Sequence, residues 1–166
     1  NNCEYECESI NGSKLKDLSQ DFGYCLGVLH HIPDTYLGLK TCVNKLKVGA
    51  PLLLYIYYKF DNKPLIYKLI WLVSDFFRKI ISKLPFVIKS YICFFIAITI
   101  YFPLVKLSKI LHKLDVNVEN IPLSNYKNKT FYFMKTDALD RFGTKLEKRF
   151  TKKEIQTMMQ KAGLID

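Results

Sequence analysis

The sequence predicts an α/β protein whose parallel sheet is interrupted by a large helical insert. Residues 22–28 and 52–58 are short apolar runs with the composition of buried strands, and the second run carries no charge. The segment between them has helical periodicity. A strand, a helix and a second strand joined by short connectors form a βαβ unit, which requires a parallel sheet and a right-handed crossover.

The helix of this unit has a clear start signal. Pro33 and Asp34 end the first apolar run, and the side-chain oxygen of Asp34 or Thr35 can cap a helix that extends to Leu46. The sequence Val-Gly-Ala-Pro that follows forms a turn into the second strand. Together with the polar segment before them, these elements make residues 1–58 one half of a sheet domain.

Residues 59–130 are predicted to form a helical insert that is both apolar and basic. Three stretches within it are expected to be helical, two of them amphipathic and one uncharged: residues 64–84, 104–114 and 90–105, respectively. Pro85 and Pro103 favour short helices in this region. Residues 115–130 have the composition of a loop.

The chain is expected to return to the sheet domain over residues 131–166. Thr151 and Glu154 belong to a capping-box sequence, Thr-Lys-Lys-Glu, that starts a helix, and Gly163 ends this helix. The apolar residues after Gly163 predict the start of a further strand. A sequence that starts without Met and stops at the beginning of a strand is expected to be an internal fragment of a longer protein.

Positive charge is concentrated in the insert. The formal net charge is +10, and residues 59–114 hold ten basic and two acidic residues, a net charge of +8. Nucleic-acid binders carry basic residues on polar surfaces, whereas these edge apolar helices, so no nucleic-acid partner is expected. Three interpretations of the insert stay open: a membrane span, a lid with peripheral membrane contact through residues 60–114, and a buried helical cap.

The cysteines favour a cytoplasmic protein, with membrane association through the insert as the open question. Five cysteines occur without a Cys-x-x-Cys pair, and no secretory signal region opens the sequence. This pattern is typical of reduced thiols in a reducing compartment. No cluster of His, Cys and acidic residues has the spacing of a metal site, so none is predicted.

The most specific motif spans residues 21–34, Asp-Phe-Gly-Tyr-Cys-Leu-Gly-Val-Leu-His-His-Ile-Pro-Asp. It resembles the fourth strand and following loop of class I S-adenosylmethionine-dependent methyltransferases of the type 11 group. Residues 45–54 resemble that family's turn into strand five, and residues 151–164 resemble its last helix, which leads into strand six. The resemblance implies a partial Rossmann-like methyltransferase sheet that holds strands 4 and 5 and the end of strand 3.

The sequence also departs from the family's pattern. Gln20 stands where the family has an apolar residue, and Val48 replaces its proline. The Gly-rich loop after strand one and the acidic residue after strand two, which grip the cofactor, are absent from these residues. The resemblance therefore implies that residues 1–166 alone are inactive, whereas the full-length protein binds S-adenosylmethionine.

By register with the family, the cofactor meets the ends of strands three and four. The residues implied are Ser9, Ile10, Asn11, Cys25, Leu26 and Gly27. Cys25 and Leu26 could equally be core residues, whereas Gly27 lets a ligand approach the backbone closely. His30 and His31 are candidates for taking a proton from the acceptor, and bracing of the loop is the alternative.

Three tyrosines and one arginine are candidates for acceptor binding: Tyr55, Tyr57, Tyr58 and Arg141. The tyrosines could instead lie in the sheet core. Arg141 or Arg149 could bind an anionic acceptor or could form a surface ion pair with Asp137, Asp140 or Glu147. The predicted function is methyl transfer from S-adenosylmethionine to an unidentified, amphiphilic small molecule. The alternative is a membrane-associated helical module carried on an inactive methyltransferase-like fold.

Overall fold

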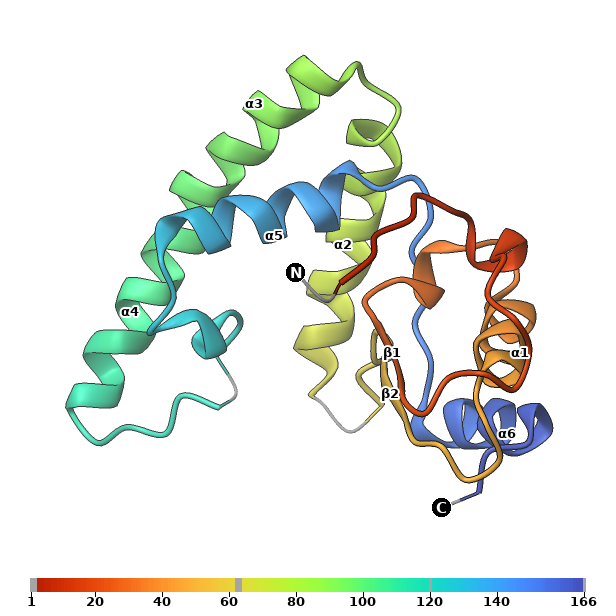
Figure 1. The fold of residues 1–166 in the computed structure, drawn as a ribbon. Coiled ribbons are helices and arrows are strands. Elements are labelled where there is room, and N and C mark those ends of the chain that lie inside the picture. Colours follow the sequence, from red (N-terminus) through yellow and green to blue (C-terminus); the bar gives the residue numbers. More distant parts are fainter. Residues whose placement is uncertain (1–2, 62–63, 120, 166) are drawn as a thin grey trace. The chain divides into compact units, whose positions relative to one another are not determined.

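The computed structural model describes residues 3–61, 64–119 and 121–165 of a mixed α/β protein in which helices predominate (Figure 1). The chain divides into two compact units. Residues 1–61 and 146–166 form the first, called the sheet unit, and residues 62–145 form the second, called the helical unit. The helical unit is therefore inserted in the chain between the two parts of the sheet unit.

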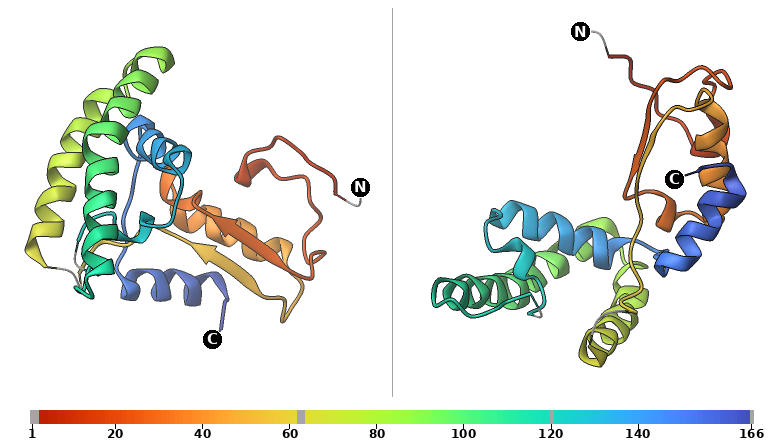
Figure 2. Two further views of the ribbon diagram at one scale, coloured as in Figure 1. Left: turned by 90° about the vertical axis from the view of Figure 1, so that its left-hand side faces the viewer. Right: turned by 90° about the horizontal axis from the view of Figure 1, so that it is seen from below.

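The predicted strand–helix–strand arrangement is present in the sheet unit. β1 (Gly23–Leu26) and β2 (Leu52–Tyr55) pair in parallel. α1 (Thr35–Lys45) connects them, and α6 (Lys152–Ala162) packs against α1. Figure 2 shows both helices on the same side of the two strands, so one face of the sheet is covered within this unit.

Local signals in the sequence set the ends of these helices. The carboxylate of Asp34 accepts a hydrogen bond from the amide of Leu37 at 2.9 Å and so caps α1. In the predicted capping box of α6, the Thr151 hydroxyl accepts from the Glu154 amide at 3.2 Å and the Glu154 carboxylate accepts from the Thr151 amide at 2.7 Å. Gly163 ends α6 with a φ of 99°. These three predictions are confirmed.

The sheet has two strands in the part of the chain that the structure describes. The family register placed Ser9 to Asn11 at the end of a third strand. In the structure Ser9 precedes the 3₁₀ turn Ile10–Gly12, and Ile10 and Asn11 are part of it; this turn contacts α1. The residues before this turn are exposed and largely polar, so they offer no apolar side chains to bury in a sheet. The strand expected after Gly163 is not formed at Leu164 and Ile165.

The helical unit contains four α-helices in its described residues: α2 (Leu65–Ile81), α3 (Phe86–Ile96), α4 (Phe102–Lys113) and α5 (Phe131–Gly143). α5 packs against both α2 and α3 (Figure 1). The core of this unit is formed by buried side chains from both sides of that contact, including Cys93, Ala97, Tyr101, Met134, Ala138 and Phe142.

The end of the insert lies at residue 145 in the structure and not at residue 130, where the sequence placed it. Residues 131–143 form α5, and Met134, Ala138 and Phe142 lie on one face of it at spacings of four. This face packs into the same core as α3, so α5 belongs to the helical unit. Residues 146–166 alone return to the sheet unit.

Pro103 does not end a helix, contrary to the sequence-based expectation. α3 and α4 are joined by the π-helical turn Ala97–Tyr101, and Pro103 lies at the start of α4. The wider turn interrupts the regular backbone ladder where proline has no N–H to donate, so the helix continues through it. The resulting helix, Phe86–Lys113, has 28 residues and is long and apolar enough to cross a membrane, by length and composition only.

Candidate functional site

The candidate site lies at the carboxyl ends of β1 and β2. Leu26 pairs with Tyr55 in register, and the amide of Gly27 donates to the carbonyl of Tyr55 at 3.1 Å, one step beyond the paired residues. Gly27 has a φ of +75°, and no atom lies within 4 Å of the position that a Cβ would take. The backbone at this edge therefore leaves space for a ligand to approach closely.

His30, His31 and Tyr57 form an aromatic cluster next to these strand ends. The ring of His30 stacks on the ring of Tyr57 with centroids 3.7 Å apart, and the ring of His31 meets Tyr57 edge-on at 5.7 Å. His30 is fully buried, so its side chain packs inside the sheet unit and supports the loop. Of the two predicted catalytic histidines, His31 is the one that is half-buried.

The hydrogen bond of His31 determines where its lone pair lies. Its Nδ1 is 2.6 Å from the carbonyl oxygen of Leu146. Because a carbonyl oxygen can only accept, Nδ1 carries the proton, and the neutral ring has its lone pair at Nε2. Nε2 of His31 is therefore the nitrogen that would accept a proton, and this atom is itself buried within the sheet unit.

A buried ion pair lies beside the aromatic cluster. Arg149 Nε donates to Glu147 Oε1 at 2.8 Å, and the two side chains are 7% and 3% exposed. Arg149 also donates to the carbonyl of Tyr58 at 3.1 Å, and its guanidinium lies 5.2 Å from the centre of the Tyr57 ring. The expected pairing with Glu147 is thus formed, but inside the sheet unit and not on its surface.

Residues 146–150 are the part of the site that the sequence did not reveal. The amide of Lys148 donates to the carbonyl of His30 at 2.9 Å, and the amide of Phe150 donates to the carbonyl of Tyr57 at 3.0 Å. The segment therefore runs beside the residues that follow β2, and it contacts His31 across 115 positions of sequence. No local sequence pattern predicts such a long-range contact. The one sequence feature that could have indicated this segment is the pair Glu147 and Arg149, which lies between apolar residues just before the capping box.

The structure separates the residues that the family register assigned to the cofactor. Leu26 is exposed and Gly27 half-buried at the strand ends, whereas Cys25 lies in the core. Ile10 packs against the same core, and its neighbours Ser9 and Asn11 are exposed on the 3₁₀ turn. Gly27 and Leu26 are therefore the members of this set that lie at the strand ends with access to a ligand.

Cys25 is engaged with a second cysteine. Its thiol forms a hydrogen bond with the thiol of Cys42 on α1, which together with burial raises the pKa of Cys25. The same hydrogen bond lowers the pKa of Cys42 to about 7. Cys25 therefore lies in the core beside Cys42, which is the alternative to ligand binding that the sequence left open.

The candidate acceptor-binding residues are also divided. Tyr55 is exposed at the end of β2, and its ring meets that of Tyr57 edge-on with centroids 6.1 Å apart. Tyr58 is half-buried and forms a parallel bridge with Phe150. Arg141 lies on α5 of the helical unit, where its Nε is 3.4 Å from a carboxylate oxygen of Asp137. The tyrosines therefore share the sheet unit with the histidines, and Arg141 belongs to the other unit.

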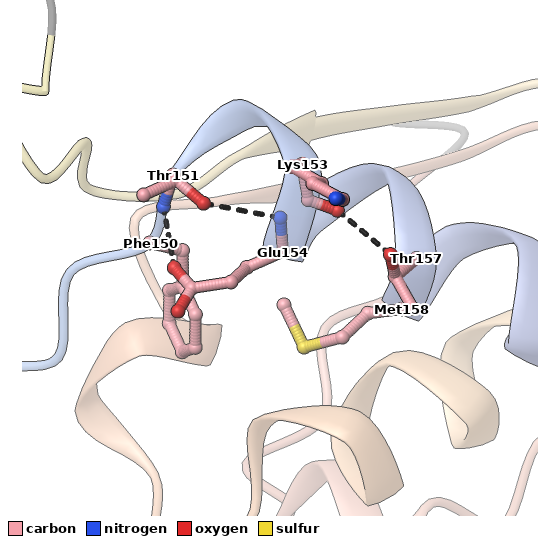
Figure 3. A pocket seen from close by; sticks show the side chains of 6 residues that line it. All are labelled: Phe150, Thr151, Lys153, Glu154, Thr157 and Met158. Atoms are coloured by element: carbon pink, nitrogen blue, oxygen red, sulfur yellow. Dashed lines mark hydrogen bonds between the residues drawn. The ribbon is translucent and has the colours of Figure 1, made fainter.

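A hollow of about 430 Å³ opens at the start of α6 (Figure 3). Its lining consists of Phe150, Thr151, Lys153, Glu154, Thr157 and Met158. The Thr157 hydroxyl donates to the Lys153 carbonyl at 2.9 Å, and Thr151 and Glu154 bond each other in the capping box. The amide of Thr151 stabilises the carboxylate and so lowers the pKa of Glu154. This hollow belongs to the helix cap, and the strand-end site is a separate feature.

The strand-end site combines a close backbone approach, aromatic side chains and one candidate proton acceptor. Within residues 3–61, 64–119 and 121–165, no three His, Cys, Asp or Glu side chains are grouped so that they could hold a metal ion. The arrangement therefore suits a small organic ligand at the sheet edge and proton transfer at His31. No protein-family model, curated protein or solved structure matches this chain.

Proposed function

We propose that the protein transfers a methyl group from S-adenosylmethionine to a small amphiphilic acceptor, and that β1 and β2 belong to a Rossmann-like sheet. The observation that carries the proposal is the position of Gly27, Tyr57 and His31 at the carboxyl ends of two parallel strands. Open parallel sheets bind ligands at this edge. The motif at residues 21–34, which resembles class I methyltransferases, forms the first of these strands and the loop that carries His31.

Gly27, Leu26 and Tyr55 are the residues that would hold S-adenosylmethionine. A Cβ on Gly27 would fill the open space beside the backbone. The exposed side chains of Leu26 and Tyr55, paired across the two strands, offer an apolar surface to a flat ring. When bound, S-adenosylmethionine supplies an electrophilic methyl group on a sulfonium sulfur.

His31 would take the proton that an acceptor hydroxyl or amine gives up. The Nδ1–H donation to Leu146 fixes the ring and places the lone pair at Nε2, which is buried, so proton transfer requires that the loop open to admit the acceptor. His30 and Tyr57 act by position, because their stacked rings hold the loop that carries His31. Methyl transfer asks little more of the protein than alignment and exclusion of water.

The helical unit is inserted in the chain next to residues of the proposed site. The chain leaves the sheet unit after Asp61, four residues beyond Tyr57, and returns at Leu146, whose carbonyl accepts from His31. One connection therefore follows Tyr57 closely in the sequence, and the other begins at the residue that accepts the hydrogen bond of His31. The apolar composition and net charge of +8 over residues 59–114 suit an acceptor with an apolar part and an anionic or polar head.

Substitution of Gly27 is expected to weaken cofactor binding selectively. In the full-length protein, Gly27→Val should raise the Kd for S-adenosylmethionine at least about tenfold, because the side chain would occupy the ligand's space. Gly49→Val is the matched control, since Gly49 has a φ of +82°, has no atom within 4 Å of its Cβ position and precedes β2 at the opposite end of the strand. Each substitution costs about 1–2 kcal/mol of backbone strain. Titration calorimetry measures both Kd values.

Two outcomes of this comparison would contradict the proposal. A Gly27→Val protein that is folded by circular dichroism and binds with the wild-type Kd would show that the ligand does not pass over the end of β1. Equal weakening by Gly49→Val would show that strain, and not occupied space, causes the loss.

A further inference from the structure

α2 exposes the apolar face that its sequence pattern predicts to be buried. The side chains along this face are at least half exposed and recur at helical spacing: Leu65, Leu69, Leu72, Val73, Phe76 and Ile80. Leu65 is 80% exposed and Phe76 is 61% exposed. Contiguous apolar patches of this kind are uncommon on soluble monomers and mark surfaces that bind something.

The face of α2 that packs on its own unit carries a buried charged residue as well as apolar ones. Arg78 is buried, and it donates to the carbonyls of Thr144 at 3.2 Å and Lys145 at 2.9 Å. Arg78 Nε also donates to Asp75 at 3.0 Å. The buried face of α2 therefore holds Arg78 and Ile81, whereas the apolar stripe points outward.

The charges that border this stripe have one sign. Lys68, Lys79 and Lys83 are exposed. Asp75 is the one acidic residue in the sequence from residue 64 to 114, and its side chain is 13% exposed and paired with both Arg78 and Lys79. The exposed charged side chains of residues 64–83 are therefore positive, which is the complement of an anionic surface.

A second copy of the chain fits this surface poorly. A two-fold interface over the stripe would bring the lysines that border one α2 towards those that border the other. An anionic lipid bilayer satisfies both features, since acyl chains accept the apolar side chains and phosphate groups meet the lysines.

The neighbouring helix Phe86–Lys113 has one face that does not suit lipid. The hydroxyl of Tyr101 donates to Asp137 of α5 at 2.9 Å, and Asp137 is also paired with Arg141. A span through the hydrocarbon core would place these charged groups among acyl chains, at high cost. The helical unit is therefore suited to lie on a bilayer and not to cross it.

We propose that α2 lies in the interfacial region of an anionic lipid bilayer. Leu69, Leu72 and Phe76 enter the acyl-chain boundary, and Lys68, Lys79 and Lys83 contact lipid phosphates. The proposal is independent of methyl transfer, because it depends on the helical unit alone.

Sedimentation of the full-length protein with vesicles tests this contact. Binding to phosphatidylcholine vesicles that contain phosphatidylglycerol should exceed binding to pure phosphatidylcholine by at least about tenfold, and added salt should weaken it. Leu69→Ser/Phe76→Ser should lower binding by about tenfold or more. Val48→Ser is the matched control, since Val48 is 96% exposed on the sheet unit, and it should bind as wild type does. Circular dichroism checks that each variant keeps its helix content.

A second variant keeps the test decisive if the serine variant loses its helices. Lys68→Gln/Lys83→Gln leaves the apolar stripe intact and should abolish the preference for anionic vesicles. Wild-type binding by both double variants would overturn the proposal. Retention in membranes after an alkaline carbonate wash would overturn it in favour of a span, and a vesicle-independent dimer that the serine variant dissociates would overturn it in favour of a second copy.

Discussion

Arg149→Met is expected to lower the free energy of unfolding of the sheet unit by about 3–5 kcal/mol. The substitution keeps the aliphatic part of the side chain but removes the guanidinium that donates to the carboxylate of Glu147, which is 3% exposed. It also removes the donor to the Tyr58 carbonyl and the contact of the guanidinium with Tyr57. Urea unfolding followed by hydrogen exchange in β1 and β2 measures the loss in this unit separately from the helical unit.

Two further variants separate the buried charge from other effects. Glu147→Gln/Arg149→Met should recover most of the lost stability, because the interior then holds neither charge of the pair. Lys47→Met breaks the exposed pair with Asp21, whose side chains are 50% and 83% exposed, and should cost less than about 1 kcal/mol. An Arg149→Met protein that loses no more stability than Lys47→Met would show that the pair is not a structural element of the site.

Replacement of residues 62–145 by a flexible linker is expected to abolish acceptor turnover and to leave cofactor binding unchanged. The linker must bridge the gap between residues 61 and 146. Tyr58 pairs in parallel with Phe150, and residue 61 lies three positions after Tyr58 whereas residue 146 lies four positions before Phe150, so the gap corresponds to about seven extended residues. Seven extended residues cover about 23 Å, a distance that about 16 Gly and Ser residues bridge. We expect turnover of an amphiphilic acceptor to fall at least about a hundredfold, which corresponds to about 2.7 kcal/mol of transition-state stabilisation. Transfer of labelled methyl measures turnover, and calorimetry measures binding of S-adenosylmethionine.

The interpretation of this deletion depends on a folded sheet unit. A cofactor Kd within about threefold of wild type provides that control. Turnover at the wild-type rate in such a protein would contradict the proposal that the helical unit selects the acceptor.

Local chemistry explains what the sequence predicted well. The cap at Asp34, the capping box of Thr151 and Glu154, and the positive φ of Gly163 each depend on a few adjacent residues. Two apolar runs on either side of a capped helix were enough to predict parallel pairing of β1 and β2, which the structure confirms.

Long-range contacts explain what the sequence did not reveal. Leu146 approaches His31 across 115 positions, and Glu147 and Arg149 become buried only because their segment lies beside the residues that follow β2. In the same way, the helical pattern of α2 locates an apolar stripe but does not state whether protein or lipid covers it. The placement of α5 in the helical unit depends on packing with α3, which lies more than 30 positions earlier in the chain.

Hydrogen exchange of the full-length protein with and without S-adenosylmethionine tests the central claim most directly. If the cofactor binds at the carboxyl ends of β1 and β2, the peptides that cover residues 26–31 and 55–58 should exchange more slowly in its presence. Peptides that cover Gly49 and the turn before β2 should be unaffected, because they lie at the opposite end of the strand. Protection at both strand ends is the predicted result. Saturating cofactor that leaves exchange at residues 26–31 and 55–58 unchanged would contradict the claim.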